Sequence, residues 1–285
     1  MYRLEIGEGD DIRTINGFPE PEKAPAQIQF TVDQTPNAER SYAEITIYGL
    51  NKDSRKAIYN EGETVRLIAG WQDGYGSIFD GEIKNVAAGR DGAETFLTLY
   101  CQSLAEFWAT IYINRSFGAG TPVRDIVSAV AETLGPVEFV GELQLPTAIN
   151  GKNIQGTARQ AMNQLANSFG FEWMIENRRV VVHKPGAVRD QAEPFRYNAL
   201  SGLIGSPEIT QKGVDIDVLM NPFIRPWDLF ELEAVTAALS FNGIYYQSQQ
   251  FPEINGKGTN QAISLVHEGD FYGDRWQTRI EGRRL

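Results

Sequence analysis

The sequence predicts a mainly β protein with an inserted α+β unit: two antiparallel, barrel-like β segments flank a small unit of two helices and a hairpin. The hydrophobic period is about two residues in the outer parts of the chain and about 3.6 residues in the middle part. The charge changes at the same places, because the net charge is −7 over residues 1–120, 0 over 121–190 and −4 over 191–285. The predicted domains are therefore 1–118, 119–190 and 191–285.

The first segment is expected to consist of strands interrupted by one helix. Alternation of apolar and polar side chains between Gly and Asp clusters is typical of half-buried antiparallel strands. Four stretches show it: residues 41–48, 63–69, 77–86 and 93–101. The helix is expected over 52–59, with Asn51 as its N-cap. Residues 8–25 are rich in Gly, Pro and charge, and we expect them to form a long mobile loop.

The middle segment has two helix patterns followed by a hairpin. Thr121 and Pro122 suit the N-cap and first position of a helix that ends before Gly135. A second helix is expected from Thr157, which forms a capping box with Gln160. Residues 171–175 and 180–183 then alternate around an Asn-Arg turn, which predicts a small α+β unit.

The third segment again has the strand pattern. Its prolines lack the backbone donor of a sheet ladder and belong at edges or turns. Six strands are expected, over residues 214–220, 229–234, 239–241, 245–251, 261–266 and 275–280. Residues 256–260 are expected to form a hairpin loop.

Composition excludes several classes of function. The chain has 285 residues and a net charge of −11, which disfavours nucleic-acid-binding and anionic-lipid-binding surfaces. Its mean hydropathy is −0.32, and no stretch approaches the roughly 18 apolar residues of a membrane span. The N-terminus lacks the pattern of a signal peptide, so synthesis and folding are expected in a cytoplasm. The single cysteine, Cys101, excludes an internal disulfide and is expected in a core.

No catalytic motif is apparent, and no cofactor or metal site is expected. Two histidines, His183 and His267, and one cysteine do not supply a zinc site, and P-loop and nucleophile-elbow patterns are missing. Paired carboxylates are the remaining acid/base candidates, since glycosidases need only two. They are Asp80 with Glu82, Asp215 with Asp217, and Glu268 with Asp270 around Gly269. Solvated strand faces account for the first two pairs, and a tight turn accounts for the third.

Large aromatic side chains in Gly-rich turns are candidate interface anchors, because Trp and Tyr dominate interface hot spots. Trp71 and Tyr75 lie in one such turn, and Phe271 and Tyr272 lie in another. Many of the other aromatic residues alternate with apolar residues and are expected in the core, but a large aromatic side chain at a loop tip has no core role there.

Nearly the whole chain resembles the central hub proteins of phage tail baseplates. The resemblance is carried by residues 43–50 (AEITIYGL), 74–86 (GYGSIFDGEIKNV), 121–127 (TPVRDIV), 156–161 (GTARQA), 202–207 (GLIGSP), 219–222 (LMNP) and 267–270 (HEGD), in that order. Met220 stands where the family usually has Leu, and Trp227 where Gly usually follows Pro. Trp227 therefore joins the interface candidates as a contact specific to this chain.

The resemblance implies a non-catalytic protein of the virion tail baseplate. The outer segments would be tube-type antiparallel β-barrels, and three chains would present six of them in a ring. Such a homotrimer would join a tail tube or tube-initiator protein to a three-fold spike protein, with the middle domain facing neighbouring baseplate proteins. DNA would pass without specific binding, and acidic barrels lining the channel would repel its phosphates. The other explanation of the acidity is solubility.

Three other functions remain open. The sequence is also compatible with a hub of a related contractile injection device, such as a bacteriocin particle or a secretion-system spike. A tail-associated cell-wall hydrolase would use one of the carboxylate pairs. A glycan-binding module would use Trp71 and Tyr75 as its platform.

Overall fold

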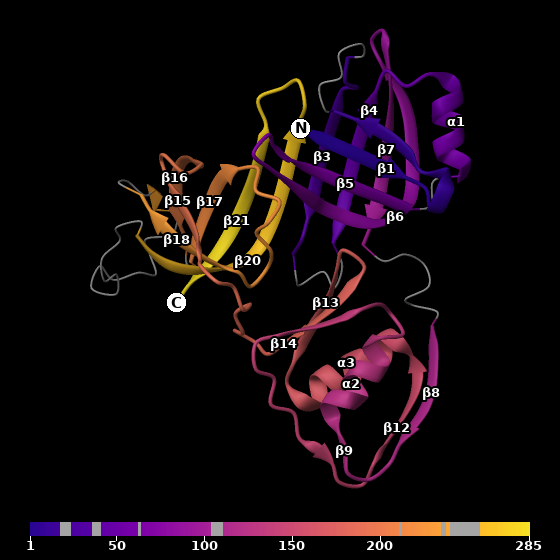
Figure 1. Ribbon diagram of the computed structural model, residues 1–285, viewed down its shortest axis with the longest axis vertical. Helices are drawn as coiled ribbons and strands as arrows, with labels where there is room; N and C mark the ends of the chain where they lie inside the picture. Colours follow the sequence, from indigo (N-terminus) through magenta and orange to yellow (C-terminus); the bar gives the residue numbers. More distant parts are fainter. Residues whose placement is uncertain are drawn as a thin grey trace.

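A computed structural model describes residues 1–17, 24–35, 41–61, 64–103, 111–210, 213–234, 238–239 and 257–285. Three groups of elements follow one another along the chain, and the middle group lies below the two outer groups in Figure 1. No helix in the described parts has both the length and the apolar character needed to cross a membrane.

The first segment is mostly strands, as predicted. It contains β1 (Tyr2–Ile6), β2 (Arg13–Asn16), β3 (Ile28–Asp33), β4 (Tyr42–Tyr48), α1 (Lys52–Glu61), β5 (Thr64–Trp71), β6 (Gly74–Asp91) and β7 (Glu94–Gln102). Asn51 caps α1, since its side-chain oxygen accepts a hydrogen bond from the Ser54 N–H at 2.7 Å. The expected loop over 8–25 is wrong in part, because Gly9–Asp11 forms a 3-10 turn and β2 pairs with β1. Residues 18–23 lie outside the described parts.

The middle segment contains more strands than predicted. Its elements are β8 (Tyr112–Phe117), β9 (Thr121–Pro122), α2 (Val123–Ala131), β10 (Val137–Val140), β11 (Thr147–Ala148), β12 (Lys152–Thr157), α3 (Ala158–Phe169), β13 (Glu172–Glu176) and β14 (Arg179–His183). The capping box of Thr157 and Gln160 is confirmed. The predicted N-cap of the first helix is wrong: Thr121 and Pro122 pair with β11, and the Thr121 hydroxyl donates to the Gly118 carbonyl.

The third segment contains β15 (Phe195–Asn198), β16 (Leu203–Ile209), β17 (Val214–Leu219), β18 (Leu229–Glu233), β19 (Ala238–Leu239), β20 (Lys257–Asp270) and β21 (Trp276–Arg284). The expected loop over 256–260 is wrong from Lys257 onward, because β20 starts there and pairs with β18. The strand expected over 245–251 lies outside the described residues, and so does most of the one over 239–241.

The two outer segments belong to one fourteen-stranded sheet. Its order is β19-β16-β17-β21-β20-β3-β4-β7-β6-β5-β1-β2, with β18 pairing to β20 and β15 pairing to β18. The mainly β fold with an α+β insertion is confirmed. The expected closure of each segment into its own barrel is not found among the described strands, and the antiparallel pair β3–β20 joins the two segments into one sheet.

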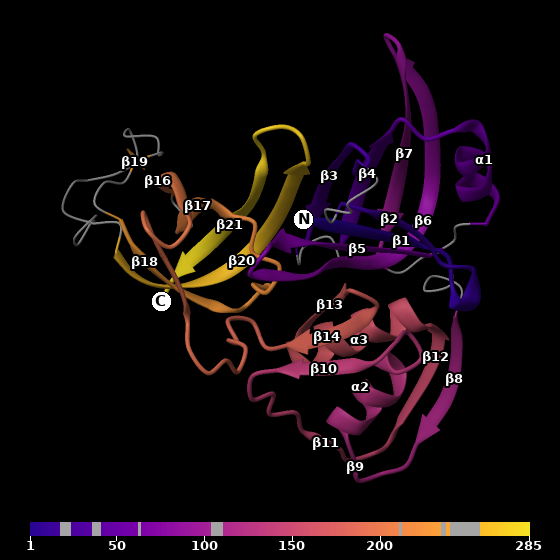
Figure 2. The same cartoon turned by 45° about the horizontal axis from the view of Figure 1, so that its top comes forward.

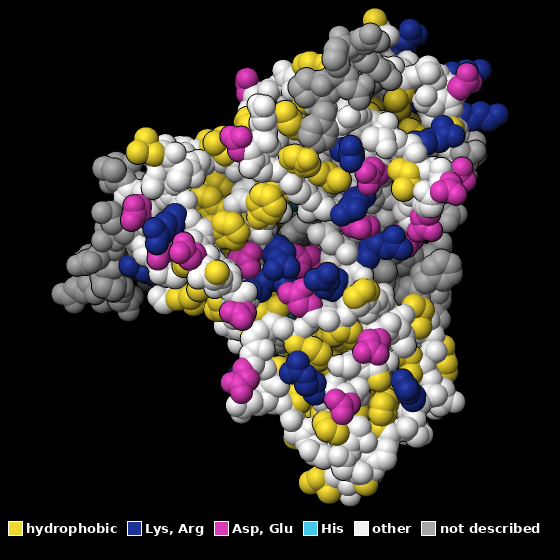
Figure 3. Space-filling view, viewed as in Figure 1, with side chains coloured by type: hydrophobic (Ala, Val, Ile, Leu, Met, Phe, Trp, Pro, Cys, Tyr) yellow, Lys and Arg dark blue, Asp and Glu magenta, His cyan; other side chains and the backbone are white. Residues whose placement is uncertain are grey.

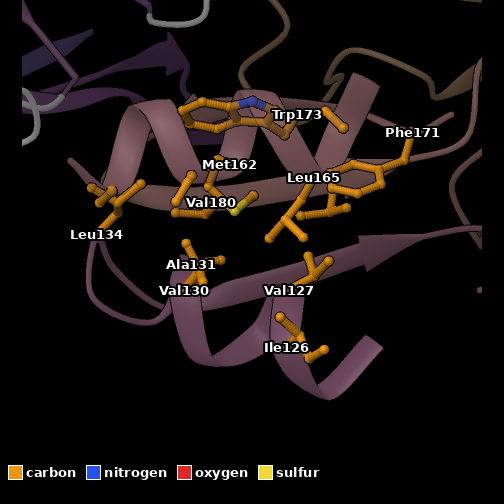
Figure 4. Close-up of a cluster of buried hydrophobic side chains, with 14 of the residues drawn as sticks. Ile126, Val127, Val130, Ala131, Leu134, Met162, Leu165, Phe171, Trp173 and Val180 are labelled. Carbon is orange, nitrogen blue, oxygen red and sulfur yellow. The ribbon is translucent and has the colours of Figure 1, made fainter. Parts of the chain in front are cut away.

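Three large hydrophobic cores follow the three segments. In the middle segment, side chains of α2 and α3 point toward one another, as Figure 4 shows for Val127, Val130, Met162 and Leu165, and they pack in one core with residues of the β13–β14 hairpin. Apolar residues at helical spacing supply this face, as the 3.6-residue period predicts. The cores of the outer segments lie on one face of the common sheet and consist of alternate strand residues.

Candidate assembly interface

The antiparallel pairing of Val266–Asp270 with Gln29–Asp33, which we call the β3–β20 junction, shows how one β segment binds another. The ladder is extended beyond the strands by hydrogen bonds from the Gln34 N–H to the Leu265 carbonyl at 2.8 Å and from the Phe271 N–H to the Ile28 carbonyl at 3.0 Å. Two strand edges that would otherwise present unpaired backbone groups are thereby satisfied within the chain.

Aromatic side chains seal the core side of the junction. The rings of Phe30 and Trp276 meet edge to face with centroids 5.3 Å apart, and those of Tyr2 and Phe271 do so at 5.0 Å. The indole N–H of Trp276 donates to the Gly70 carbonyl at 3.1 Å. Met220, from the end of β17, is buried in the core of the first segment. The third segment thus completes the core of the first, and such aromatic pairs stabilise by about 1 kcal/mol beyond their area.

On the polar side of the junction, Asp270 forms hydrogen bonds that link the two segments. Its two carboxylate oxygens accept hydrogen bonds from the side-chain amides of Gln27 at 2.7 Å and Gln29 at 2.9 Å. Desolvation opposes its ionisation, but these bonds and those from the backbone of Gly273 and Tyr272 outweigh it and lower the pKa of Asp270. The carboxylate therefore stays charged and holds the two segments together.

His267 lies inside the junction and is fully buried. Its Nδ1 lies 2.9 Å from the Thr278 hydroxyl, whereas its Nε2 is buried without a hydrogen-bond partner. Burial lowers the pKa of His267 to about 4, so the imidazole is neutral at pH 7.

A buried ionic group fixes the middle segment to the third. Arg189, whose side chain is 2 % exposed, donates to Glu176 at 2.5 Å, to Glu138, and through Nε to the Pro226 carbonyl at 2.8 Å. Desolvation raises the pKa of Glu138, but Arg189, Arg179 and Arg225 lower it by more. We call Arg189, Glu176, Glu138 and Trp227 the Arg189 cluster.

Trp227 belongs to the interior and does not reach the outer surface. Its side chain is 3 % exposed and lies between His183, with ring centroids 4.0 Å apart, and the Arg189 guanidinium, 5.5 Å from its ring. Its φ is 70°, a left-handed conformation that favours glycine, and the backbone turns tightly here although a tryptophan occupies the position. Because the indole fills the contact between the middle and third segments, we infer that its packing offsets the backbone strain.

The middle segment also contacts the first. The Ser103 hydroxyl donates to the Ile175 carbonyl at 3.0 Å, and the Asn177 side chain accepts from the Asp80 N–H at 3.0 Å. Burial outweighs the attraction of Arg178 and Arg66 and raises the pKa of Asp80. Asn177 and Arg178 have φ values of 45° and 62°, which fits the predicted hairpin turn.

The other aromatic candidates lie near the β3–β20 junction. Trp71, Tyr75 and Tyr272 are 45 %, 51 % and 62 % exposed, while Phe271 is half-buried between Tyr2 and Trp276. Sequence reasoning missed Phe223, which is 54 % exposed and packs beside Gly74 and Gly76. Figure 3 shows hydrophobic side chains gathered between the two upper lobes of the molecule. The role of Trp71, Tyr75, Phe271 and Tyr272 as interface anchors stays a prediction.

The face of the common sheet opposite the cores, which we call the open face, is polar and acidic. Glu208, Asp215 and Glu281 lie directly opposite one another on three adjacent strands. Burial and then repulsion from Glu281 and Glu208 raise the pKa of Asp215. A second row, Glu268–Thr31–Glu44, crosses the β3–β20 junction and lines a hollow of about 600 Å³.

The carboxylate pairs are engaged in structural contacts. Asp80 lies against the middle segment, as described above, and Asp217 forms an ion pair with Arg279 at 3.0 Å. Glu268 and Asp270 lie on β20, so the tight turn expected around Gly269 is wrong. Cys101 is buried, and burial raises the pKa of its thiol well above the usual range. Within the described ranges, no group of three or more His, Cys, Asp or Glu side chains is placed to hold a metal ion.

Comparisons with known proteins agree with this geometry. The family model described as "Baseplate hub gp41" matches residues 20–246. A tail protein from Neisseria meningitidis MC58 has a similar structure, with a TM-score of 0.60 at 12% identity over 99% of this chain and 96% of that chain. The 43 kDa tail protein of prophage MuSo2 from Shewanella oneidensis gives 0.58 at 8% identity over 99% and 98%.

An Escherichia coli protein described as a component of the type VI secretion system, with structural similarity to the T4 bacteriophage tail proteins gp27 and gp5, gives a TM-score of 0.54. The identity is 7%, over 93% of this chain and 76% of that chain. These likenesses concern the fold. No curated protein sequence matches this chain.

The Arg189 cluster predicts a large loss of stability on removal of its cation. Arg189→Met leaves Glu176 buried without a counter-ion and should lower the free energy of unfolding by about 3–5 kcal/mol. Arg179→Met is the matched control, because Arg179 pairs with Glu138 at 3.0 Å but is 53 % exposed; its cost should stay below about 1 kcal/mol. Urea unfolding measures both, and equal effects would contradict the structural role of the buried cluster.

His267 predicts an acid-sensitive junction. Because its pKa is about 4 in the folded chain and 6.5 in the unfolded chain, only the unfolded state binds the proton between these values. Stability should therefore fall as the pH drops below 6.5, with about 2 kcal/mol lost by about pH 5. Urea unfolding at neutral and acid pH should show this loss in the natural chain and a smaller loss in His267→Gln. Identical pH dependence in the two proteins would exclude His267 as its source.

Proposed function

Since this chain belongs to the baseplate hub gp41 family, we propose that it is the structural central hub of a phage tail baseplate. In this role it works as a homotrimer in the virion tail, joining the tail tube or a tube-initiator protein to a three-fold spike protein. The hub trimer is built from chains that each contribute two equivalent β segments, giving a ring with pseudo-six-fold symmetry. Such a ring matches six-fold symmetry on one side and three-fold symmetry on the other.

The relation between the two outer segments carries this proposal. In the first segment the strands are ordered β3-β4-β7-β6-β5-β1, and in the third they are ordered β16-β17-β21-β20-β18-β15. Each order follows the same sequence of elements along the chain, and the two units meet edge to edge through β3 and β20. Edge-to-edge contact between equivalent units is the arrangement that a ring of such units needs.

The open face supports a role as the wall of a DNA channel. Its carboxylates, in the two rows Glu208–Asp215–Glu281 and Glu268–Thr31–Glu44, run across strands of both segments. In the first row like charges lie directly opposite one another, which destabilises a sheet, so solubility alone is a poor reason for that alignment. Facing a channel, they repel DNA phosphates and let the genome pass without binding.

The middle domain, over residues 119–190 between the β domains 1–118 and 191–285, lies outside the ring in this proposal and faces neighbouring baseplate proteins. Trp71, Tyr75, Phe271 and Tyr272 are proposed contacts with the adjoining layers of the tail. The role requires no catalysis and no cofactor, and the carboxylates considered for hydrolysis are held in ion pairs, hydrogen bonds and sheet rows.

A hub of a related contractile injection device is the second candidate. One similar fold belongs to a component of a type VI secretion system that itself resembles phage tail proteins. The same trimeric ring would then carry a secretion spike in place of a phage spike, and the identity of the spike protein that binds the ring separates the two candidates.

The proposed function predicts a trimer. Native mass measurement of the purified chain, alone and mixed with the spike protein encoded in the same genome, should give a mass of three chains or a complex that contains three. A monomer under both conditions would contradict the hub trimer. Loss of turbidity of purified peptidoglycan on addition of the chain would instead favour the hydrolase alternative.

Charge on the open face should control DNA retention by the trimer. Glu44→Lys/Glu281→Lys places two cations on that face and should create DNA binding that weakens steeply with salt, because each phosphate contact releases counterions. Asp125→Lys/Glu132→Lys makes the same change in net charge on the exposed surface of the middle segment and is the matched control. Filter binding of labelled DNA measures both. Equal binding by the two variants, or strong salt-sensitive binding by the natural trimer, would contradict the channel.

A further inference from the structure

We propose that the outer half of β6, residues 87–91, pairs with the outer edge of β16 in a second copy of this chain, in the antiparallel register that β20 and β3 use within the chain. The inference rests on the proposed hub trimer and names the two edges that close it. It commits to one occupant for both edges, another copy of the same chain.

The first argument is that β6 and β20 are equivalent strands. Both are long, both pair through their first half with an earlier, shorter strand of their segment (β5 for β6, β18 for β20), and both pair with the last strand of their segment through their second half. Each carries a register shift at the same place, between Ile83 and Asn85 in β6 and between Ala262 and Ser264 in β20. Because β-bulges are placed specifically in a sheet, this shared bulge aligns the two strands residue by residue.

The neighbouring registers agree with that alignment. Cys101 lies opposite both Ala43 and Ile83, and Gly282 lies opposite both Val214 and Ala262. The same alignment therefore matches β4 with β17 and β7 with β21. It places Ala87 at the position of Val266, and Ala88 at the position of His267.

The equivalent edges differ in what covers them. The second half of β20 is covered by β3, and His267 is fully buried there. At the corresponding position of β6, Ala88 is exposed, and among the described strands β7 is the partner of this half of β6. Figure 2 shows the β6–β7 hairpin projecting beyond the rest of the first segment. An uncovered strand edge of this kind is a template for another strand.

The complementary edge belongs to β16, the equivalent of β3. Its inner side pairs with β17, as β3 pairs with β4. Its outer side carries β19, a parallel strand of two residues that lies opposite Glu208 and Ile209. In the proposed contact β6 of the neighbour takes the place of β19, because antiparallel pairing is slightly more stable per residue than the parallel pairing of β19.

The register of the β3–β20 junction predicts the register between β16 of one copy and β6 of its neighbour. Val266 lies opposite Asp33 and His267 lies opposite Val32 in the β3–β20 junction. Ile209 corresponds to Val32, because the two occupy the same place opposite Val214 and Ala43. Ala88 should therefore lie opposite Ile209 of the neighbouring copy, and Ala87 opposite Thr210.

The two edges lie on opposite sides of the molecule, with β6 in the first segment and β16 at the far end of the third (Figure 1). A contact between unlike edges is head-to-tail, and such contacts close into a ring when the rotation permits. Thr95 stands where the third segment has Trp276, so the contact between copies lacks that part of the aromatic seal. This difference suits a contact that forms on assembly of folded chains.

Cysteine pairing tests the register. Ala87→Cys and Thr210→Cys, made in separate chains, should give a disulfide-linked dimer when the two variants are mixed and oxidised, because directly opposed strand residues lie within disulfide range. Neither variant alone should dimerise, since the contact joins unlike edges and Cys101 is buried. The double variant should give covalent species up to the trimer on a non-reducing gel.

Two controls accompany the test. Val266→Cys/Asp33→Cys should form an internal disulfide without a change in mass, because it occupies the equivalent place in the β3–β20 junction. A mixture of Ala88→Cys and Thr210→Cys is out of register by one residue, so its side chains point to opposite faces and should not react. Hydrogen exchange of the natural chain gives an independent measurement: amides 87–91 should exchange more slowly in the trimer than in the monomer.

The outcomes separate this inference from the proposed function. A trimer by native mass in which the Ala87 and Thr210 cysteines do not react and amides 87–91 are unprotected overturns the strand pairing and leaves the hub intact. A chain that stays monomeric alone and with its spike protein overturns both. If the mixture of Ala88→Cys and Thr210→Cys reacts while the mixture of Ala87→Cys and Thr210→Cys does not, the proposed register is wrong.

Discussion

The structure depends on one constraint, which is that the backbone groups at the edge of a β-sheet need partners. The β3–β20 junction meets this need for two edges at once and joins segments more than two hundred residues apart in sequence. With the edges paired, the ring of Trp276 packs against Phe30, and Met220 is buried in the core of the first segment. The Asp270 carboxylate accepts hydrogen bonds from the side chains of Gln27 and Gln29. The fourteen-stranded sheet, its cores on one face and its acidic open face all follow from this contact.

The same constraint links the fold to assembly. In the proposed trimer, each chain forms two junctions of the same kind, one within itself and one with a neighbour. The open face is continuous across the internal junction because Glu268, Thr31 and Glu44 lie in register there. A ring of such units would therefore present carboxylates around its whole inner wall, which suits a channel through which DNA must pass without binding.

The middle segment is held by interactions of a different kind. Few backbone bonds join it to the sheet, and its position depends on the buried Arg189 cluster and on the Asn177–Asp80 contact. A buried ion pair contributes little net stability but is costly to break, so it favours one position over others. Trp227 has a left-handed backbone conformation, and its ring fills the contact between the segments, so its packing also favours this position of the middle segment.

The sequence by itself determined the features that depend on neighbouring residues. The segment pattern, the capping box of α3, the Asn51 cap and the turn at Asn177 were all predictable, because periodicity and capping act within a few residues. Only the tertiary structure decided which strands pair. It assigned Thr121 to β9 instead of a helix cap, moved Trp227 from the expected surface into the interior, and brought β20 beside β3. Strand partners and burial depend on contacts distant in sequence, which local patterns do not encode.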